Sequence, residues 1–160
     1  MLLCGIINEL KVSTNSLLSF FFCQGTDSRI NSATAVLRSL IYLLVKQQPQ
    51  LTSHLRKRYD QVGSSLFQDA NAWVALSKIF TSMLQDENLE TSCLVINTLN
   101  KCVMDLPKLL DLIVCTIASL SRVKWLVSSQ NEDHIKQKLK LVSDEAELSL
   151  ELKDNAEQVA

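Results

Sequence analysis

Glycine and proline are scarce in this sequence, with 3 glycines and 2 prolines among 160 residues. A phosphate-binding loop needs several glycines close together, because backbone N–H groups must approach the phosphates, and three scattered glycines cannot form one. Scarce turn formers also predict few turns and long helices. The hydrophobic fraction of 47% and the charged fraction of 21% nevertheless indicate a globular chain, long enough for one domain of ordinary size.

An excess of charge of one sign is also missing. The sequence has 16 basic and 17 acidic side chains, which give a net charge of -1. Because this balance gives no field that would attract nucleic acid or an anionic membrane, we expect neither partner. The longest apolar runs, residues 17–23 and 109–120, are shorter than the roughly 20 residues that span a bilayer. No basic segment precedes the apolar start, so we predict no signal peptide and expect a cytoplasmic location.

Clustered metal ligands are absent from the sequence. The histidines, His54 and His134, are isolated, and no two of the 5 cysteines form a CxxC pair. The odd number of thiols predicts reduced, buried cysteines in an intracellular protein. They are Cys23 and Cys102 and, inside apolar runs, Cys4, Cys93 and Cys115.

Apolar periodicity divides the chain into alternating strands and helices. Short apolar runs bounded by turn residues predict buried strands, and apolar residues at helical spacing predict amphipathic helices. The predicted strands are residues 17–22, 92–97, 123–128 and 148–152, and the predicted helices are residues 1–11, 33–48, 51–63, 70–84, 105–119 and 131–140. This alternation predicts a parallel α/β sheet with right-handed crossovers. An all-helical scaffold, the alternative, would need the first three strands to be helical, which their length and flanking turns disfavour.

Local patterns add three further predictions. Asp105 is placed to cap the helix that follows it. Trp73 and Trp125 lie in apolar periodic segments and are expected to pack in the core. The most basic stretch, residues 54–59, is predicted to be the solvated face of a short helix, and a phosphate-binding patch is the alternative.

The strand predicted at residues 92–97 ends in an unusual set of polar residues. Ligands bind beyond the carboxyl ends of parallel strands, and phosphoryl transfer needs carboxylates there to hold Mg²⁺ and orient water. This strand instead ends in Asn97 and is followed by Asn100 and Lys101. An amide supplies no negative charge to Mg²⁺, and a lysine adds a positive charge. This strand end and the residues directly after it therefore lack the carboxylates that phosphoryl transfer needs.

Much of the sequence resembles the NACHT domain of fungal NLR-like signalling proteins, relatives of the vegetative incompatibility proteins and of proteins with a nephrocystin-type N-terminal domain. The most specific stretch reads "FFFCQGTDSRINSATAVLRSLIYLL". The similar segments are residues 1–10, 17–51, 69–80, 93–102, 106–114, 123–131 and 148–152. The resemblance implies a P-loop NTPase of the STAND class, a switch that controls self-assembly and uses ATP or GTP with Mg²⁺.

The sequence departs from this family where the family's chemistry lies. The family's Gly-Lys-Thr phosphate loop precedes the segment similar to residues 1–10, and this chain starts at Met1, so we expect the loop and its strand to be absent. The resemblance places Asn97, Asn100 and Lys101 at the Walker B acids and Gln130 at a sensor arginine. We therefore predict a degenerate nucleotide site with no catalytic residue, no metal ligand and no cofactor.

The resemblance predicts an incomplete P-loop NTPase sandwich over residues 1–155, with residues 156–160 starting a further segment. Residues 17–22, 92–97 and 123–128 are expected to be adjacent parallel strands in this order. A missing phosphate-loop strand predicts marginal stability, oligomerisation or completion by another chain. Two functions remain open. One is an inactive fragment that acts with intact NACHT proteins or by self-association, and the other is a nucleotide-binding switch with weak affinity and no turnover.

Overall fold

Three parallel strands form the middle of the structure, a computed structural model that describes residues 2–13, 15–64, 72–130 and 132–140. The strands are β1 (Leu17–Phe22), β2 (Ser92–Asn97) and β3 (Val123–Val127), and they lie in this order across the sheet. Both strand pairs are parallel and in register, so the three carboxyl ends lie at the same edge. The predicted positions, parallel direction and order of these three strands are confirmed. Within the described residues the sheet has no fourth strand.

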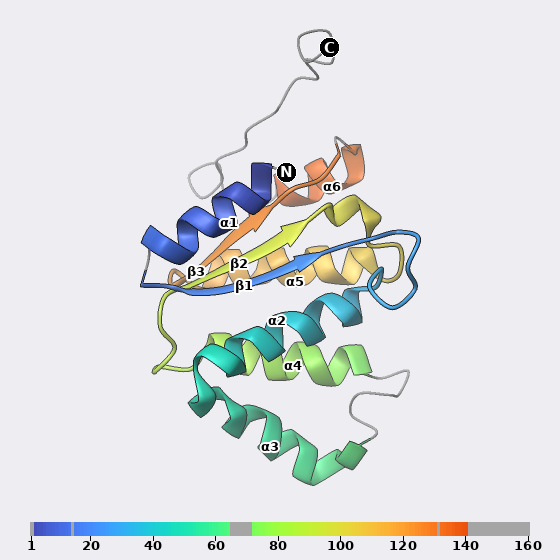
Figure 1. Ribbon diagram of the computed structural model, residues 1–160. Coiled ribbons are helices and arrows are strands. Elements are labelled where there is room, and N and C mark those ends of the chain that lie inside the picture. Colours follow the sequence, from blue (N-terminus) through green and yellow to red (C-terminus); the bar gives the residue numbers. More distant parts are fainter. Residues whose placement is uncertain (1, 14, 65–71, 131, 141–160) are drawn as a thin grey trace, which may run out of the picture.

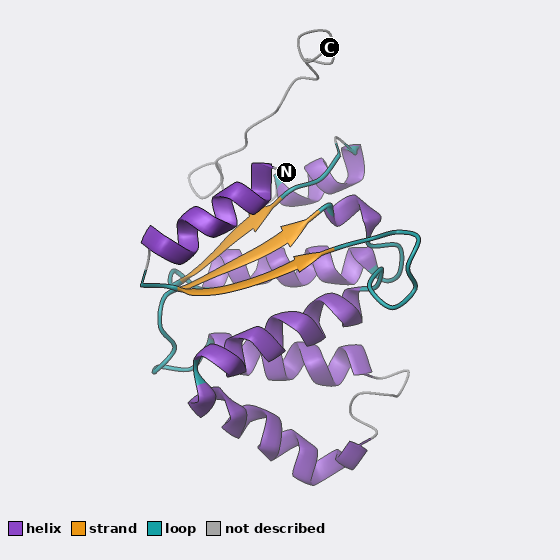
Figure 2. Cartoon of the chain, in the orientation of Figure 1, coloured by secondary structure: helices purple, strands orange, loops and turns teal. Residues whose placement is uncertain are grey.

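Helices cover both faces of the sheet, which gives the predicted three-layer α/β fold (Figures 1 and 2). Helix α1 lies on one face, α2 and α5 lie on the other, and α4 and α3 lie further out beside α2. The helices are α1 (Leu2–Ser13), α2 (Ala33–Gln47), α3 (Thr52–Val62), α4 (Ala72–Leu84), α5 (Leu106–Ser119) and α6 (Asp133–Leu139), and the 3-10 turns are η1 (Pro49–Leu51) and η3 (Leu99–Lys101).

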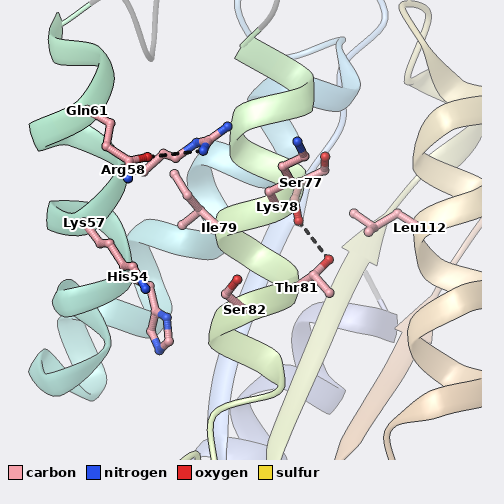
Figure 3. A pocket seen from close by; sticks show the side chains of 10 residues that line it. All are labelled: His54, Lys57, Arg58, Gln61, Ser77, Lys78, Ile79, Thr81, Ser82 and Leu112. Carbon is pink, nitrogen blue, oxygen red and sulfur yellow. Dashed lines mark hydrogen bonds between the residues drawn. The ribbon is translucent and has the colours of Figure 1, made fainter.

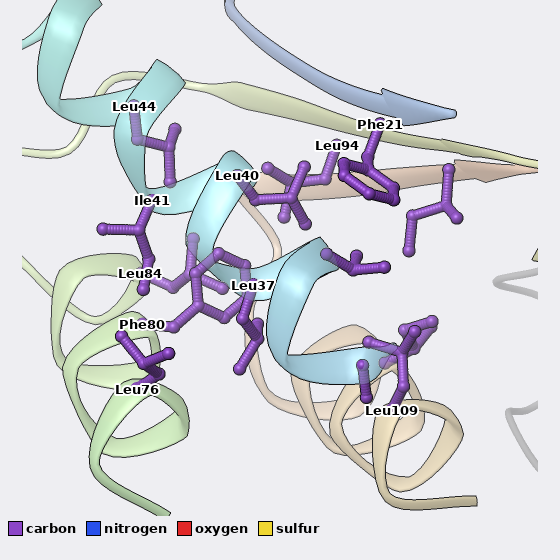
Figure 4. Close-up of a cluster of buried hydrophobic side chains, with 14 of the residues drawn as sticks. Phe21, Leu37, Leu40, Ile41, Leu44, Leu76, Phe80, Leu84, Leu94 and Leu109 are labelled. Carbon is purple, nitrogen blue, oxygen red and sulfur yellow. The ribbon is translucent and has the colours of Figure 1, made fainter. Parts of the chain in front are cut away.

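The larger core lies between the sheet and helices α2, α4 and α5 (Figure 4). Strand residues that point to this face alternate with those that point to α1, as the pleat of a strand requires. The fully buried side chains here include Leu37, Leu40, Phe80, Leu94 and Leu109, each with 0% exposure. Burial of such a side chain contributes about 1.5–3 kcal/mol. The smaller cluster on the other face joins Leu3 and Ile7 of α1 to Leu18 and Val95.

The two tryptophans pack against the larger core, as predicted. The Trp125 ring meets Phe80 edge to face, with 6.2 Å between ring centroids. Its indole Nε1 donates a hydrogen bond of 2.9 Å to Thr116 Oγ1, so the polar end of the ring also has a partner. These contacts fix β3 to α4 and α5.

A side chain closes the outer edge of β1. The Gln47 Oε1 accepts a hydrogen bond of 2.9 Å from the Leu18 N–H, and the Gln47 Nε2 donates one of 2.7 Å to the Leu18 oxygen. The same Nε2 donates to the Leu43 oxygen at 2.8 Å, which holds the amide against its own helix. Unpaired backbone groups on an edge strand invite pairing with another chain. Gln47 occupies these groups as a neighbouring strand would.

Replacing Gln47 with methionine should lower the free energy of unfolding by about 1–2 kcal/mol, because both Leu18 backbone groups lose their partner. Urea denaturation followed by far-UV circular dichroism measures the change. The control is Gln50→Met, at an exposed position in η1, which should change stability by less than about 0.5 kcal/mol. Equal urea midpoints for the two variants would contradict the edge-closing role of Gln47.

Asp105 lies at the N-cap position of α5, but its side chain does not cap the helix. The residue is left-handed, with φ of 61°, and its carboxylate pairs with the Lys108 ammonium at 3.1 Å. The predicted capping hydrogen bond is therefore wrong, because the left-handed backbone does not have the extended conformation that an N-cap normally has.

The described residues test some of the remaining predictions and leave others outside their range. The basic stretch 54–59 lies on α3, a helix without a fully buried residue. The strand predicted at 148–152 and the boundary between residues 155 and 156 lie outside the described residues. Among the helices described, none has the length and apolar character needed to cross a membrane.

Candidate functional site at the carboxyl edge of the sheet

The polar residues that follow the three strands interlock at the carboxyl edge of the sheet. Ser128, directly after β3, is at the centre of this network. Its Oγ accepts a hydrogen bond of 3.0 Å from the Thr98 N–H and donates one of 2.5 Å to Asn97 Oδ1. Its backbone N–H donates to the Ile96 oxygen at 3.0 Å. The pairing of β2 with β3 therefore continues, through side chains, beyond the last strand residues.

Thr98 connects the same network to β1. Its backbone is left-handed, with φ and ψ both 53°, which is a costly conformation for a β-branched residue. Its hydroxyl donates a hydrogen bond of 3.0 Å to the Cys23 oxygen, and the Cys23 N–H donates one of 3.1 Å to the Asn97 oxygen. These hydrogen bonds hold the strained residue in place, so the turn after β2 is fixed to both neighbouring strands.

Asn100 and Gln130 bind each other at the same edge. The Asn100 Nδ2 donates to the Gln130 Oε1 at 3.2 Å, and the Gln130 N–H donates to the Asn100 Oδ1 at 3.1 Å. The sequence points to Asn100 and Gln130 independently of each other. The structure brings their side chains into direct contact. The Asn100 amide therefore has a partner on its nitrogen and on its oxygen within the protein itself.

Lys101, the third predicted position after β2, is exposed. Its stem runs beside the loop after β1, where a Cβ at Gly25 would lie 3.5 Å from the Lys101 Cδ. This loop carries Asp27, whose carboxylate pairs with the Arg29 guanidinium at 2.8 Å. Hydrogen bonds from Arg29 lower the pKa of Asp27 to about 2, so it is ionised but already engaged. Lys101 thus adds positive charge to an edge where Asn97 and Asn100, as neutral amides, supply no negative charge.

Magnesium chemistry does not fit these side chains. Mg²⁺ is held in proteins by carboxylates and phosphates, whereas the donors here are amides and hydroxyls that bind one another. Within the part of the chain that the structure describes, no three His, Cys, Asp or Glu residues are grouped so that they could hold a metal ion. The arrangement can fix the strand ends in place, and it offers no group that would activate water.

The cysteines near this edge do not offer a nucleophile either. Burial raises the pKa of Cys23 to about 12 and, as the main cause, that of Cys102 to about 11. Both are therefore protonated at neutral pH, and a thiol is a far weaker nucleophile than a thiolate. The prediction that all five cysteines are buried is wrong for Cys115, which is exposed on α5, and Cys4 and Cys93 are half-buried.

Ser128 and Thr98 are the residues that sequence reasoning missed as members of this site. Ser128 serves as a hydrogen-bond bridge between the ends of two strands. The available signal was the common length of the strands. Because β2 and β3 run in parallel register, Ile96 pairs with Val127, and Asn97 therefore faces Ser128.

Comparisons with known proteins identify relatives of this chain. The family described as "Nephrocystin 3, N-terminal" matches residues 1–130. The "Vegetative incompatibility protein HET-E-1" of Podospora anserina is 56% identical over 161 residues, which cover 100% of this chain and 12% of that protein. The chain thus spans about an eighth of the length of this relative. No solved structure matches the chain.

Proposed function

The chain belongs to the Nephrocystin 3, N-terminal family, and we propose that it is a catalytically inactive part of a NACHT-type signalling NTPase of the STAND class. The proposal includes its partners: it acts by association with intact relatives or with a second copy of itself. The relative named as a vegetative incompatibility protein supports a signalling role. The proposal takes residues 1–155 as this NTPase-like unit and places it in the cytoplasm, where its free cysteines stay reduced.

The reciprocal hydrogen bonds between Asn100 and Gln130 are the observation that carries this proposal. Phosphoryl transfer depends on groups that hold the metal, orient the nucleophile and stabilise developing charge. At this edge the corresponding side chains bind each other, and Lys101 stands where the resemblance implies a glutamate. Loss of one such group costs orders of magnitude in rate, so loss of all of them abolishes turnover.

Measurements of phosphate release and of nucleotide binding test whether the chain is catalytically inactive. We expect no phosphate release from Mg-ATP or Mg-GTP above the protein-free blank. We also expect that millimolar Mg-ATP raises the midpoint of thermal unfolding no further than Mg-tripolyphosphate, which has the phosphates but no base or ribose. The matched variant Asn100→Leu breaks the Asn100–Gln130 pair and should behave in the same way.

A rise with Mg-ATP several degrees above that with tripolyphosphate would replace the proposal with its alternative, a nucleotide-binding switch without turnover. Phosphate release above the blank would overturn both. Association is tested separately by size-exclusion chromatography of the chain alone and mixed with a purified full-length HET-E-1-type relative. Elution as a monomer in both runs would contradict the interaction role.

A further inference from the structure

A basic groove lies far from the carboxyl edge of the sheet, on the outer helices (Figure 3). Its volume is about 590 Å³, within the range of about 300–1,000 Å³ that is usual for ligand pockets. We call it the α3–α4 groove and define it by Lys57, Arg58, Gln61, Lys78, Thr81 and Ser82. The two helices form its walls, and Leu112 of α5 contributes to its lining.

The charges in the α3–α4 groove all have one sign. Lys57 and Arg58 come from α3 and Lys78 comes from α4, and among the residues that the structure describes none that lines the groove is acidic. Both lysines are exposed. Lys57 and Arg58 belong to the basic stretch 54–59, for which the sequence left a phosphate-binding patch open as the alternative. The field between the two helices therefore favours an anion, although the protein as a whole does not.

Arg58 supplies a partly desolvated cation to the groove. Its Nε is buried without a hydrogen-bond partner, and one terminal nitrogen donates a long hydrogen bond of 3.4 Å to the Gln61 Oε1. Charge interactions are stronger where water is partly excluded, so an anion at the outer guanidinium face gains more than at an exposed arginine. His54 is engaged elsewhere: its Nε2 lies 2.7 Å from the Asp86 Oδ2.

Neutral donors accompany the cations. The Ser82 hydroxyl lines the groove from α4, and the Gln61 amide lines it from α3. Thr81 also lines the groove, but its hydroxyl already donates a hydrogen bond of 2.8 Å to the Ser77 oxygen. Guanidinium, ammonium and hydroxyl groups together are the donors that bind phosphoryl oxygens. Since the cations lie on two packed helices, an anion with several phosphoryl groups can contact both helices at once along the groove.

We propose that the α3–α4 groove binds an oligophosphate anion, a ligand with at least two phosphoryl groups, either free in solution or displayed on a lipid headgroup. The groove shares no residue with the carboxyl-edge network, so the site goes beyond the proposed function and does not depend on it. Metal-free tripolyphosphate is the probe for the free ligand, and vesicles that contain a phosphoinositide are the probe for the lipid source.

Thermal unfolding and isothermal titration calorimetry at constant ionic strength test the site. Tripolyphosphate at ten times its Kd should raise the unfolding midpoint by about 4 °C. The double variant Lys57→Gln/Lys78→Gln should bind at least about tenfold more weakly, because two charge-assisted contacts are lost. The matched control, Lys46→Gln/Lys140→Gln, removes the same charge from exposed positions outside the groove and should bind as the unchanged chain does.

Sedimentation with phosphoinositide vesicles distinguishes the two sources, since capture that the groove variant loses assigns the phosphates to a lipid. Three results would overturn the proposal. The first is the absence of both a midpoint shift and vesicle capture in the unchanged chain. The second is equal binding by the groove variant and the control. The third is tighter binding of polyglutamate than of tripolyphosphate, which would assign the groove to an acidic protein segment.

Discussion

Replacing Phe80 with alanine should lower the free energy of unfolding by about 3–5 kcal/mol, the largest loss expected for a single change described here. Phe80 is 0% exposed and fills the space between α4 and the sheet, where its ring and that of Trp125 pack edge to face. Alanine would leave a cavity, and the Trp125 indole would keep its hydrogen bond to Thr116 but lose its aromatic neighbour. Single domains are stable by only about 5–15 kcal/mol, so this loss takes a large part of the total.

Urea denaturation monitored by tryptophan fluorescence measures the effect of Phe80→Ala, because the Trp125 ring reports on the same contact. Val74→Ala in the same helix is the control, since the Val74 side chain is 49% exposed. The control should lose less than about 1 kcal/mol. A loss below 1 kcal/mol for Phe80→Ala as well would mean that α4 does not pack on the sheet as described.

Replacing Ser128 with alanine should lower the free energy of unfolding by about 2–3 kcal/mol, the second large effect. One hydroxyl serves two partners, because it accepts from the Thr98 N–H and donates to Asn97 Oδ1. Without it, a half-buried backbone N–H loses its partner at a residue whose left-handed backbone is already strained. The loss should therefore exceed that of a single exposed hydrogen bond.

Ser129→Ala is the matched control for Ser128→Ala. The Ser129 hydroxyl is exposed and donates to the Gln130 oxygen, one residue further along the chain. We expect a change below about 0.5 kcal/mol for this control. Amide hydrogen exchange adds a local measurement, because the Thr98 N–H should exchange faster in Ser128→Ala and at an unchanged rate in Ser129→Ala. Equal stabilities and equal exchange rates would contradict the central role of Ser128.

The hydrogen-bond network at the carboxyl edge gives the candidate site a structural role in the fold. In this chain the polar residues after β2 and β3 hold the strand ends together, so the network stabilises the sheet at the edge where α/β proteins bind ligands. A ligand that needed the Asn100 amide would first have to break its two hydrogen bonds with Gln130. That cost counts against the nucleotide-binding alternative, which the comparison of Mg-ATP with tripolyphosphate tests.

The sequence by itself determined where the described helices and strands lie, and that no carboxylate stands at Asn97, Asn100 or Lys101. Periodicity is a local property, so the apolar run at 92–97 and the helical spacing after Ala33 placed their strand and helix within one or two residues. Residue types are local as well, so the presence of amides and a lysine after β2 was visible directly. The order of the strands came from the resemblance to a known family.

Only the tertiary structure decided which polar groups satisfy one another. Asn100 and Gln130 are 30 positions apart, and so are Thr98 and Ser128, while Gln47 reaches Leu18 across 29 positions. The α3–α4 groove likewise depends on two helices that pack side by side. Such contacts follow from strand register and helix packing, which arise when the whole core is buried. No local pattern of residues encodes them, and for this reason the sequence alone could not predict them.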